Sequence, residues 1–178
     1  PIHVNWDTTT NATKSALRGV TEDLSDLPNL KTFVTLSPVP GFARWLDRER
    51  GLDHSRYFNA DAKATLAALD KPDWHRDPAV TSRVQDALLA AAASYFLRAK
   101  TPKGRSLDPV ARFHLGNGAR LEHLNVLGDV SPKGLAQARG LMVNYLYALD
   151  DIEKNHEVYA EKGEIVAAPR IRKLLRAE

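Results

Sequence analysis

Residues 30–42 read LKTFVTLSPVPGF, and this stretch decides the class of fold. Its first part is rich in apolar and β-branched residues, which predicts a strand over residues 30–36. Pro38 and Pro40 cannot continue a central strand, so Ser37 is expected at the strand end. Side chains at strand ends of α/β domains commonly point into a ligand-binding crevice. The alternative is that Ser37 and Pro38 form an ordinary turn.

A second stretch, DPVARFHLGNGARL over residues 108–121, leads His114 directly into a Gly-Asn-Gly turn. Its opening Asp-Pro pair is typical of a helix start, so His114 is predicted in the last turn of a short helix. Gly116 and Gly118 keep side chains away from the imidazole and permit positive φ. A histidine in this position can exchange protons near neutral pH. The alternative is a partly buried histidine that only caps a helix end.

The rest of the chain has an α/β order with a helical middle segment. Ile2, Val4 and Trp6 alternate with polar residues, which indicates a half-buried strand. Residues 141–149, LMVNYLYAL, predict a buried strand with Asn144 and Tyr145 near its middle. Cap and stop residues predict helices over residues 42–50, 61–69, 77–100, 132–139 and 150–162 and from residue 169, with Val80, Val84, Leu88, Ala91 and Tyr95 forming one apolar stripe on the longest.

Composition indicates one domain with an anionic partner. The chain has 178 residues, of which 43% are hydrophobic, enough for one substantial core. Its 25 Lys and Arg against 22 Asp and Glu give a net charge of +3, which suits an anionic ligand. The basic loop RAKTPKGR, residues 98–105, either meets phosphates or is an ordinary solvated connection. Acids interrupt the basic residues and no nucleic-acid motif occurs, so nucleic acid is not expected as a partner.

Several functional classes are excluded by what the sequence lacks. It contains no cysteine, which rules out disulfides, thiolate catalysis and zinc-thiolate sites. Its six histidines show no metal-binding helical spacing, so no metal is expected. No run approaches the roughly 18 apolar residues that cross a membrane, and the first ten residues carry no secretory pattern. These features predict a soluble, cytoplasmic protein with no membrane partner.

The strings TLSPVPGF and DPVARFHLGNGARL, followed by GLAQARGLMVNYLYALDDIEKNHEVYAEKGEIVA over residues 134–167, resemble the malonyl-CoA decarboxylase family. The resemblance runs from about residue 27 to residue 175, with the strings in family order. It implies that residues 1–178 form the family's catalytic, C-terminal domain. The fold it implies resembles the acyl-CoA N-acetyltransferases, with a mixed sheet flanked by helices. It also implies self-association and a place in fatty acid metabolism.

The resemblance implies a set of site residues. The family's catalytic serine lies in SPxPGF and matches Ser37, and its catalytic histidine lies in FHLxNGA and matches His114. The family string NYxY makes Tyr145 a candidate substrate-binding residue, although core packing is the competing role for a tyrosine there. Asn117 is a further candidate from the residues themselves, because its amide could hold either the imidazole or the thioester oxygen.

Two departures from the family concern the CoA site and the domain content. The family's N-terminal helical domain is absent from this sequence. The glycine-containing turn that receives the phosphates is abbreviated around residues 15–25, where only Arg18, Gly19 and Val20 match its start. This shortening reflects either an omitted segment or a partly lost phosphate cradle, and the second case would weaken CoA binding.

The activity implied is decarboxylation of malonyl-CoA to acetyl-CoA and CO2, with CoA as part of the substrate and no separate cofactor. His114 would protonate the enolate carbon, and Ser37 would orient the malonyl group. No GxSxG elbow surrounds Ser37, which argues against an esterase. Two alternatives remain open: a noncatalytic acyl-CoA-binding module or degenerate homologue, and an acyl-CoA N-acyltransferase.

Overall fold

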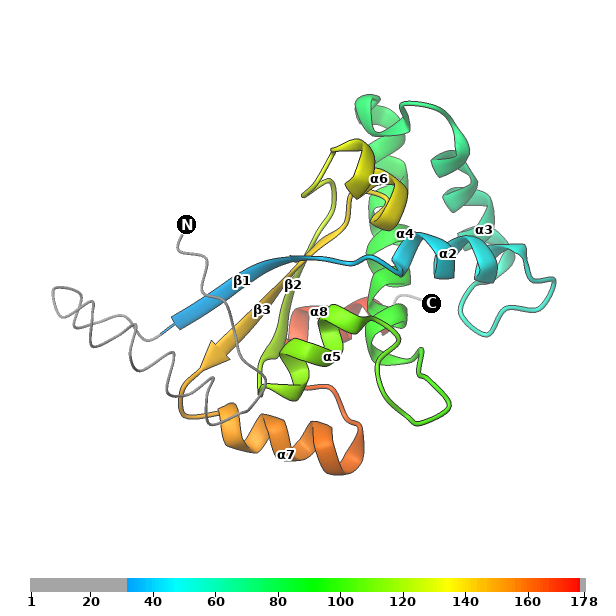
Figure 1. Ribbon diagram of the computed structural model, residues 1–178. Helices are drawn as coiled ribbons and strands as arrows, with labels where there is room; N and C mark the ends of the chain where they lie inside the picture. The colour runs from blue at the N-terminus through cyan, green and yellow to red at the C-terminus, as the bar shows by residue number, and fades with distance from the viewer. Residues whose placement is uncertain (1–31, 177–178) are drawn as a thin grey trace, which may run out of the picture.

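The computed structural model describes residues 32–176, so the strand expected around Ile2, Val4 and Trp6 lies outside the described residues. A run of helices separates the first strand from the second, a single helix separates the second from the third, and further helices follow the third strand (Figure 1). In order they are β1 (Thr32–Pro38), α2 (Phe42–Gly51), α3 (Ala60–Leu66), the 3-10 helices η1 (Ala67–Asp70) and η2 (Trp74–Arg76), α4 (Pro78–Leu97), α5 (Pro109–Gly116), β2 (Arg120–Asn125), α6 (Pro132–Ala138), β3 (Met142–Ala148), α7 (Ile152–Lys162), α8 (Pro169–Lys173) and the 3-10 helix η3 (Leu174–Arg176).

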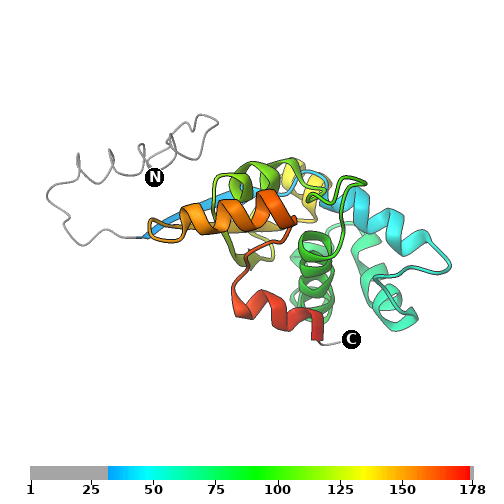
Figure 2. The ribbon, with the colours of Figure 1, turned by 90° about the horizontal axis from the view of Figure 1, so that it is seen from below.

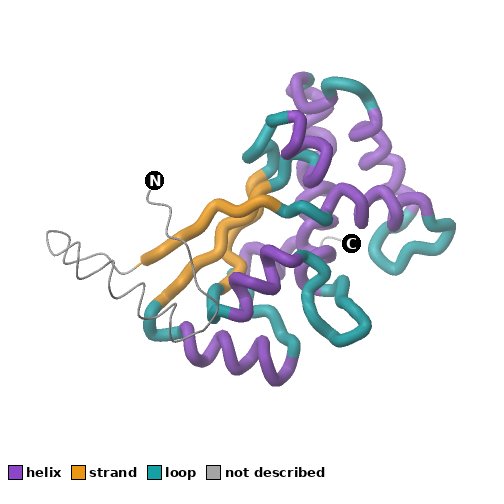
Figure 3. Tube along the Cα trace, in the orientation of Figure 1, coloured by secondary structure: helices purple, strands orange, loops and turns teal. Residues whose placement is uncertain are grey.

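The three described strands form one antiparallel sheet in the order β1-β3-β2. They lie side by side in Figure 3, with α2, α3 and α4 beyond one end of the sheet. The register places Ser37 opposite Val143 and Thr35 opposite Tyr145. An isolated parallel bridge joins Leu121 of β2 to Ala167, which lies outside the three strands. The expected class, a sheet combined with helices, is therefore confirmed, whereas the likeness to the acyl-CoA N-acetyltransferases stays a prediction.

One face of the sheet packs on helices, and among residues 32–176 no helix covers the other face. Alternation along β3 buries Val143, Tyr145 and Tyr147 on the helical side. On the opposite face, Val34 and Leu36 of β1 are 52% and 57% exposed. Directly opposed residues in an antiparallel pair share a face, so Thr35 and Ser37 point to the helical side with the β3 tyrosines.

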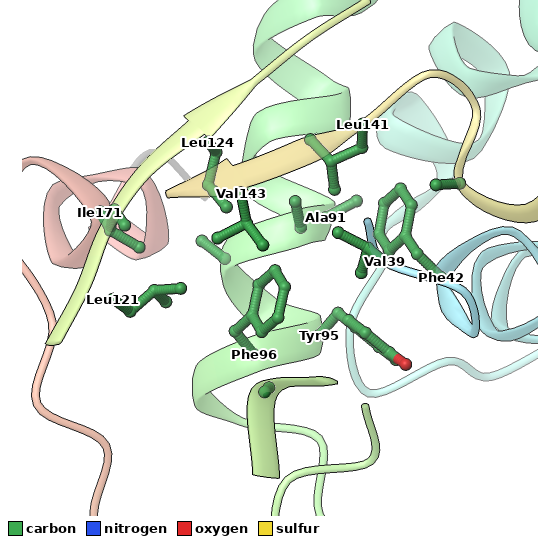
Figure 4. Packing of buried hydrophobic residues seen from close by; sticks show 14 of the residues in the cluster. Val39, Phe42, Ala91, Tyr95, Phe96, Leu121, Leu124, Leu141, Val143 and Ile171 are labelled. Carbon is green, nitrogen blue, oxygen red and sulfur yellow. The ribbon is translucent and has the colours of Figure 1, made fainter. Parts of the chain in front are cut away.

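Helix α4 is the scaffold of the core, as its apolar stripe predicts. Its buried side chains include Val84, Leu88, Ala91 and Tyr95, and Val80 is partly buried. Figure 4 shows Ala91 and Phe96 of α4 near Val143 of β3, with Leu121 and Leu124 of β2 on the same side of the helix. The small Ala91, Ala92 and Ala93 let neighbouring elements approach α4 closely. The last helical turns of the chain lie beside α4 in Figure 2, where Arg98 donates to the carbonyl of Leu175.

Local signals located the helices well. The predicted N-caps Asp77, Asp108 and Ser131 each accept a backbone N–H, and Gly163 ends α7 with positive φ.

Three elements differ from the expectation. The helix predicted over residues 61–69 is divided into α3 and the tighter η1, a common change at a helix end. Strand β3 alternates between buried and half-buried residues rather than being buried throughout. Strand β2 was not predicted, because RLEHLN carries charges and a register irregularity between Leu121 and His123.

Candidate active site

Ser37 reaches the site from the end of β1. It is the last residue before Pro38, and its side chain is 6% exposed on the helical face of the sheet. Val39 and Phe42, which follow, are completely buried and anchor the chain as it turns into α2. The strand end therefore holds the Ser37 hydroxyl at a fixed place beneath the helices.

His114 reaches the same place from the last turn of α5. The Asp108 carboxylate accepts the N–H of Ala111 at 2.8 Å and so caps the start of this short helix. Gly118 follows the helix with φ +81°, and the Asn155 amide of α7 donates to its carbonyl at 3.1 Å. Gly116 stays in helical conformation and a Cβ there would meet no atom within 4 Å. Of Gly116 and Gly118, only Gly118 adopts a backbone conformation that favours glycine.

The fold brings Ser37 and His114 together across 77 residues of sequence. The Ser37 hydroxyl lies 3.1 Å from Nε2 of His114. On the other side of the ring, Nδ1 lies 2.7 Å from the hydroxyl of Tyr147. The Thr35 hydroxyl lies 3.1 Å from that of Ser37. These four side chains form one continuous chain of hydrogen bonds, Thr35–Ser37–His114–Tyr147.

The two tyrosines of β3 contact the imidazole differently. Tyr145 stacks its ring on that of His114, with centroids 4.4 Å apart and planes 21° apart. The Tyr145 side chain is fully buried and its hydroxyl has no hydrogen-bond partner within residues 32–176. Tyr147, two residues on, holds the ring by a hydrogen bond. Sequence reasoning selected Tyr145 and missed this role of Tyr147, although the NYxY string contains both.

Asn117 is buried at the end of α5, next to the glycine turn. The sequence allowed two roles for the Asn117 amide, which were a contact with the imidazole and a contact with the thioester oxygen. Both ring nitrogens of His114 have hydroxyl partners, Ser37 and Tyr147. The imidazole is therefore held without Asn117, and contact of Asn117 with the thioester oxygen stays a prediction.

Burial controls the protonation state of the site. Removal from water lowers the pKa of His114 from its usual 6.5 to about 4, so the imidazole is neutral at pH 7. Burial also raises the pKa of Tyr145 and that of Tyr147, which keeps both phenols protonated. Burial likewise raises the pKa of Asp108, although backbone N–H groups oppose this. Because hydroxyls occupy both imidazole nitrogens, the described residues do not form a Ser-His-Asp triad.

The basic loop after α4, residues 98–105, makes hydrogen bonds to other parts of the protein. Lys100 donates to the carbonyl of Gly163 and Arg98 to that of Leu175. Thr101 and Arg105 close the loop with a backbone hydrogen bond of 2.8 Å. These contacts favour the structural interpretation of this loop over a phosphate-binding one.

The abbreviated phosphate turn, with Arg18, Gly19 and Val20, lies outside the described residues. Among residues 32–176, no group of three or more His, Asp or Glu side chains is placed to hold a metal ion. Within the same range, every helix is too short or too polar to span a bilayer.

We expect the lowered pKa of His114 to make stability depend on pH. Between pH 6.5 and about 4 the unfolded chain binds more protons at this residue than the folded one, so stability falls as pH falls through this window. The full loss at His114 is about 3 kcal/mol. Urea unfolding at pH 7, 6, 5 and 4.5 measures it, with His114→Gln as the control that lacks this contribution. Parallel curves for the two proteins would show that His114 titrates normally.

Residues 14–178 match the family model described as the malonyl-CoA decarboxylase C-terminal domain. The mitochondrial malonyl-CoA decarboxylase of Anser anser anser is 31% identical over 172 residues, which is 86% of this chain and 34% of that protein. The Mus musculus enzyme of the same name is 32% identical over 176 residues, 89% of this chain and 36% of that protein.

Solved structures give the same result. The crystal structure of malonyl-CoA decarboxylase from Rhodopseudomonas palustris is 56% identical with a TM-score of 0.86, covering 91% of this chain and 36% of that one. The Agrobacterium vitis structure of the same name is 52% identical with a TM-score of 0.83, covering 92% and 40%. The chain thus spans about a third of the length of the curated relatives it matches.

Proposed function

Because the chain belongs to the malonyl-CoA decarboxylase family, we propose that it converts malonyl-CoA to acetyl-CoA and CO2. The observation that carries the proposal is the 3.1 Å contact between the Ser37 hydroxyl and Nε2 of His114. These residues come from the two strings that match the family, and they meet in a buried place lined by protonated hydroxyls. Residues 1–178 are proposed as the domain that performs the reaction.

The reaction needs stabilisation of one charge and delivery of one proton. The bond between the malonyl carboxylate and the α-carbon breaks, CO2 leaves, and the electron pair forms a thioester enolate. A proton then bonds to the α-carbon to give the acetyl thioester. Hydrogen-bond donors aimed at the enolate oxygen lower the barrier to the first step, and a positioned acid speeds the second.

We assign the acid role to Nε2 of His114. The imidazole is neutral at pH 7, so its donor is an N–H group rather than an imidazolium. An enolate carbon is a strong enough base to take this proton. As it does, Nδ1 accepts the phenolic proton of Tyr147, 2.7 Å away, and the ring stays neutral. Water later returns the proton to Tyr147.

Ser37 is proposed to orient the malonyl group through its hydroxyl. Decarboxylation requires no acyl-enzyme, so the serine does not act as a nucleophile in this scheme. Asn117 is the proposed donor to the thioester oxygen. Tyr145 is proposed to support the site by stacking on the imidazole, with substrate contact through its ring rather than its enclosed hydroxyl. Arg18, Gly19 and Val20 remain the proposed contacts to the CoA phosphates.

Four further properties are also proposals. We propose that the protein works in fatty acid metabolism and binds no separate cofactor. We propose that it forms homo-oligomers, which sedimentation of the purified chain would test. Finally, we propose a cytoplasmic location from the sequence features, whereas the curated relatives are named as mitochondrial enzymes. Fractionation of cells that express the protein tests the location.

The deciding experiment incubates the purified chain with malonyl-CoA and no amine acceptor, and measures both acetyl-CoA and CO2. Equal amounts of the two products, lost in Ser37→Ala, would support decarboxylation by this site. Acyl transfer that appears only when an amine is added would instead support the N-acyltransferase alternative. Saturable binding of malonyl-CoA without turnover, in a chain folded by circular dichroism, would support the binding module.

A further inference from the structure

Thr35 lies beside Ser37 on the helical face of β1, two residues earlier in the strand. Its hydroxyl is 3.1 Å from the Ser37 hydroxyl, and its side chain is half-buried. Two contacts with β3 hold the backbone of Thr35. Thr35 pairs with Tyr145 in the sheet, and its carbonyl accepts a hydrogen bond from the Asn144 amide at 2.9 Å. Thr35 begins the string TLSPVPGF, but the sequence alone gives it no role in the site.

A serine hydroxyl has one proton to donate and two lone pairs to accept with. Among the described residues, the Ser37 hydroxyl has two hydrogen-bond partners, Nε2 of His114 and the hydroxyl of Thr35, each at 3.1 Å. The direction of these two contacts decides where the single Ser37 proton points. If either neighbour accepts that proton, it is no longer available to a ligand.

We propose that Thr35 is a positioning residue that donates its hydroxyl hydrogen bond to Ser37 and thereby directs the Ser37 proton toward the substrate. The proposal deepens the proposed function and rests on it, because the acid role of His114 places a proton on Nε2. This N–H donates to Ser37 until the enolate carbon forms and takes its proton. With both lone pairs of Ser37 occupied, its hydroxyl can only donate. Its natural acceptor is a carboxylate or thioester oxygen of the malonyl group.

This arrangement is the reverse of a hydrolytic serine–histidine pair. In a hydrolase the serine gives its proton to the imidazole and attacks a carbonyl. Here the imidazole and Thr35 both donate to the serine, which keeps its own proton and serves as a fixed hydrogen-bond donor. Thr35 thus explains why a close Ser37–His114 contact supports decarboxylation rather than acyl-enzyme formation.

The first test compares Thr35→Val, which removes the hydroxyl but keeps the branched shape, with Thr35→Ser, which keeps the hydroxyl. We expect Thr35→Val to lower kcat about tenfold and to change KM little, because a neutral hydrogen bond of ordinary strength is lost. Thr35→Ser should restore kcat. Equal losses in the two variants would assign the effect to packing and overturn the proposal.

The second test needs no turnover. Nitrogen NMR of the His114 ring, identified by its absence in His114→Gln, should show one protonated and one accepting nitrogen at pH 7. In Thr35→Val, Ser37 is free to donate back to Nε2, so the two ring signals should move toward each other as the tautomers mix. Thr35→Ser should keep them apart.

The two tests separate the proposals. If the unmodified chain shows no decarboxylation, the proposed function fails, yet the ring signals still decide the role of Thr35. Signals in Thr35→Val that match those of the unmodified chain would overturn it, whatever the activity of the enzyme.

Discussion

His114→Gln lowers kcat for malonyl-CoA decarboxylation by about 10²- to 10⁴-fold, the usual contribution of a positioned acid. Glutamine is close in size to histidine, so it preserves packing between α5 and Tyr145. Its amide can still contact the hydroxyls of Ser37 and Tyr147, which lie on either side of the ring. It cannot pass a proton from Tyr147 to the enolate carbon. The loss should therefore fall on turnover, with little change in the dissociation constant of acetyl-CoA.

The matched control is His123→Gln, the same exchange on the exposed side of β2. There the imidazole contacts only the side-chain oxygen of Asn125 among its described hydrogen bonds. We expect its kcat and acetyl-CoA binding to equal those of the unmodified chain. Equal losses of turnover and of acetyl-CoA affinity in His114→Gln would contradict a proton-transfer role and indicate a binding role for the histidine.

The sequence motifs predicted the two central residues of the site but not their tyrosine partner. Ser37 and His114 were predicted because each lies in a short string whose local structure is set by prolines, a cap and a glycine turn. Tyr145 and Tyr147 share one face of β3, and a period of two cannot tell which of them reaches the imidazole. That choice depends on the register with β1 and on where α5 crosses the sheet. Both are set by contacts between distant segments.

The same distinction applies to the fold. The starts of α4 and α5 and the C-terminal end of α7 follow from residues that satisfy backbone groups locally or adopt the left-handed conformation, so the sequence predicts them within a few positions. Strand β2 exists because it pairs with β3 and because residues 166–168 cover its other edge through Leu121. Neither partner is visible in RLEHLN itself. Thr35 was missed for a related reason, since only the strand geometry places its hydroxyl against Ser37.

We expect Gly118→Ala to destabilise the protein by about 2 to 5 kcal/mol. A residue with a Cβ pays about 1 to 2 kcal/mol for the left-handed conformation that Gly118 adopts at φ +81°. The new Cβ would also lie 2.2 Å from the carbonyl oxygen of Ile152, a backbone atom at the start of α7. Relieving such overlap typically costs a further 1 to 3 kcal/mol, since α5 and α7 must move apart. Urea unfolding at pH 7 measures the change.

Gly116→Ala is the matched control, two residues away in the same turn. Gly116 is helical and its Cβ would meet no atom within 4 Å, so alanine should be neutral or stabilise the helix by up to about 1 kcal/mol. Displacement of α5 should also disturb the Ser37–His114 contact, so Gly118→Ala should lose activity at temperatures where it is still folded. Equal stability of the two variants would mean that α7 moves away from α5 at little energetic cost. Gly118 would then not hold His114 in place.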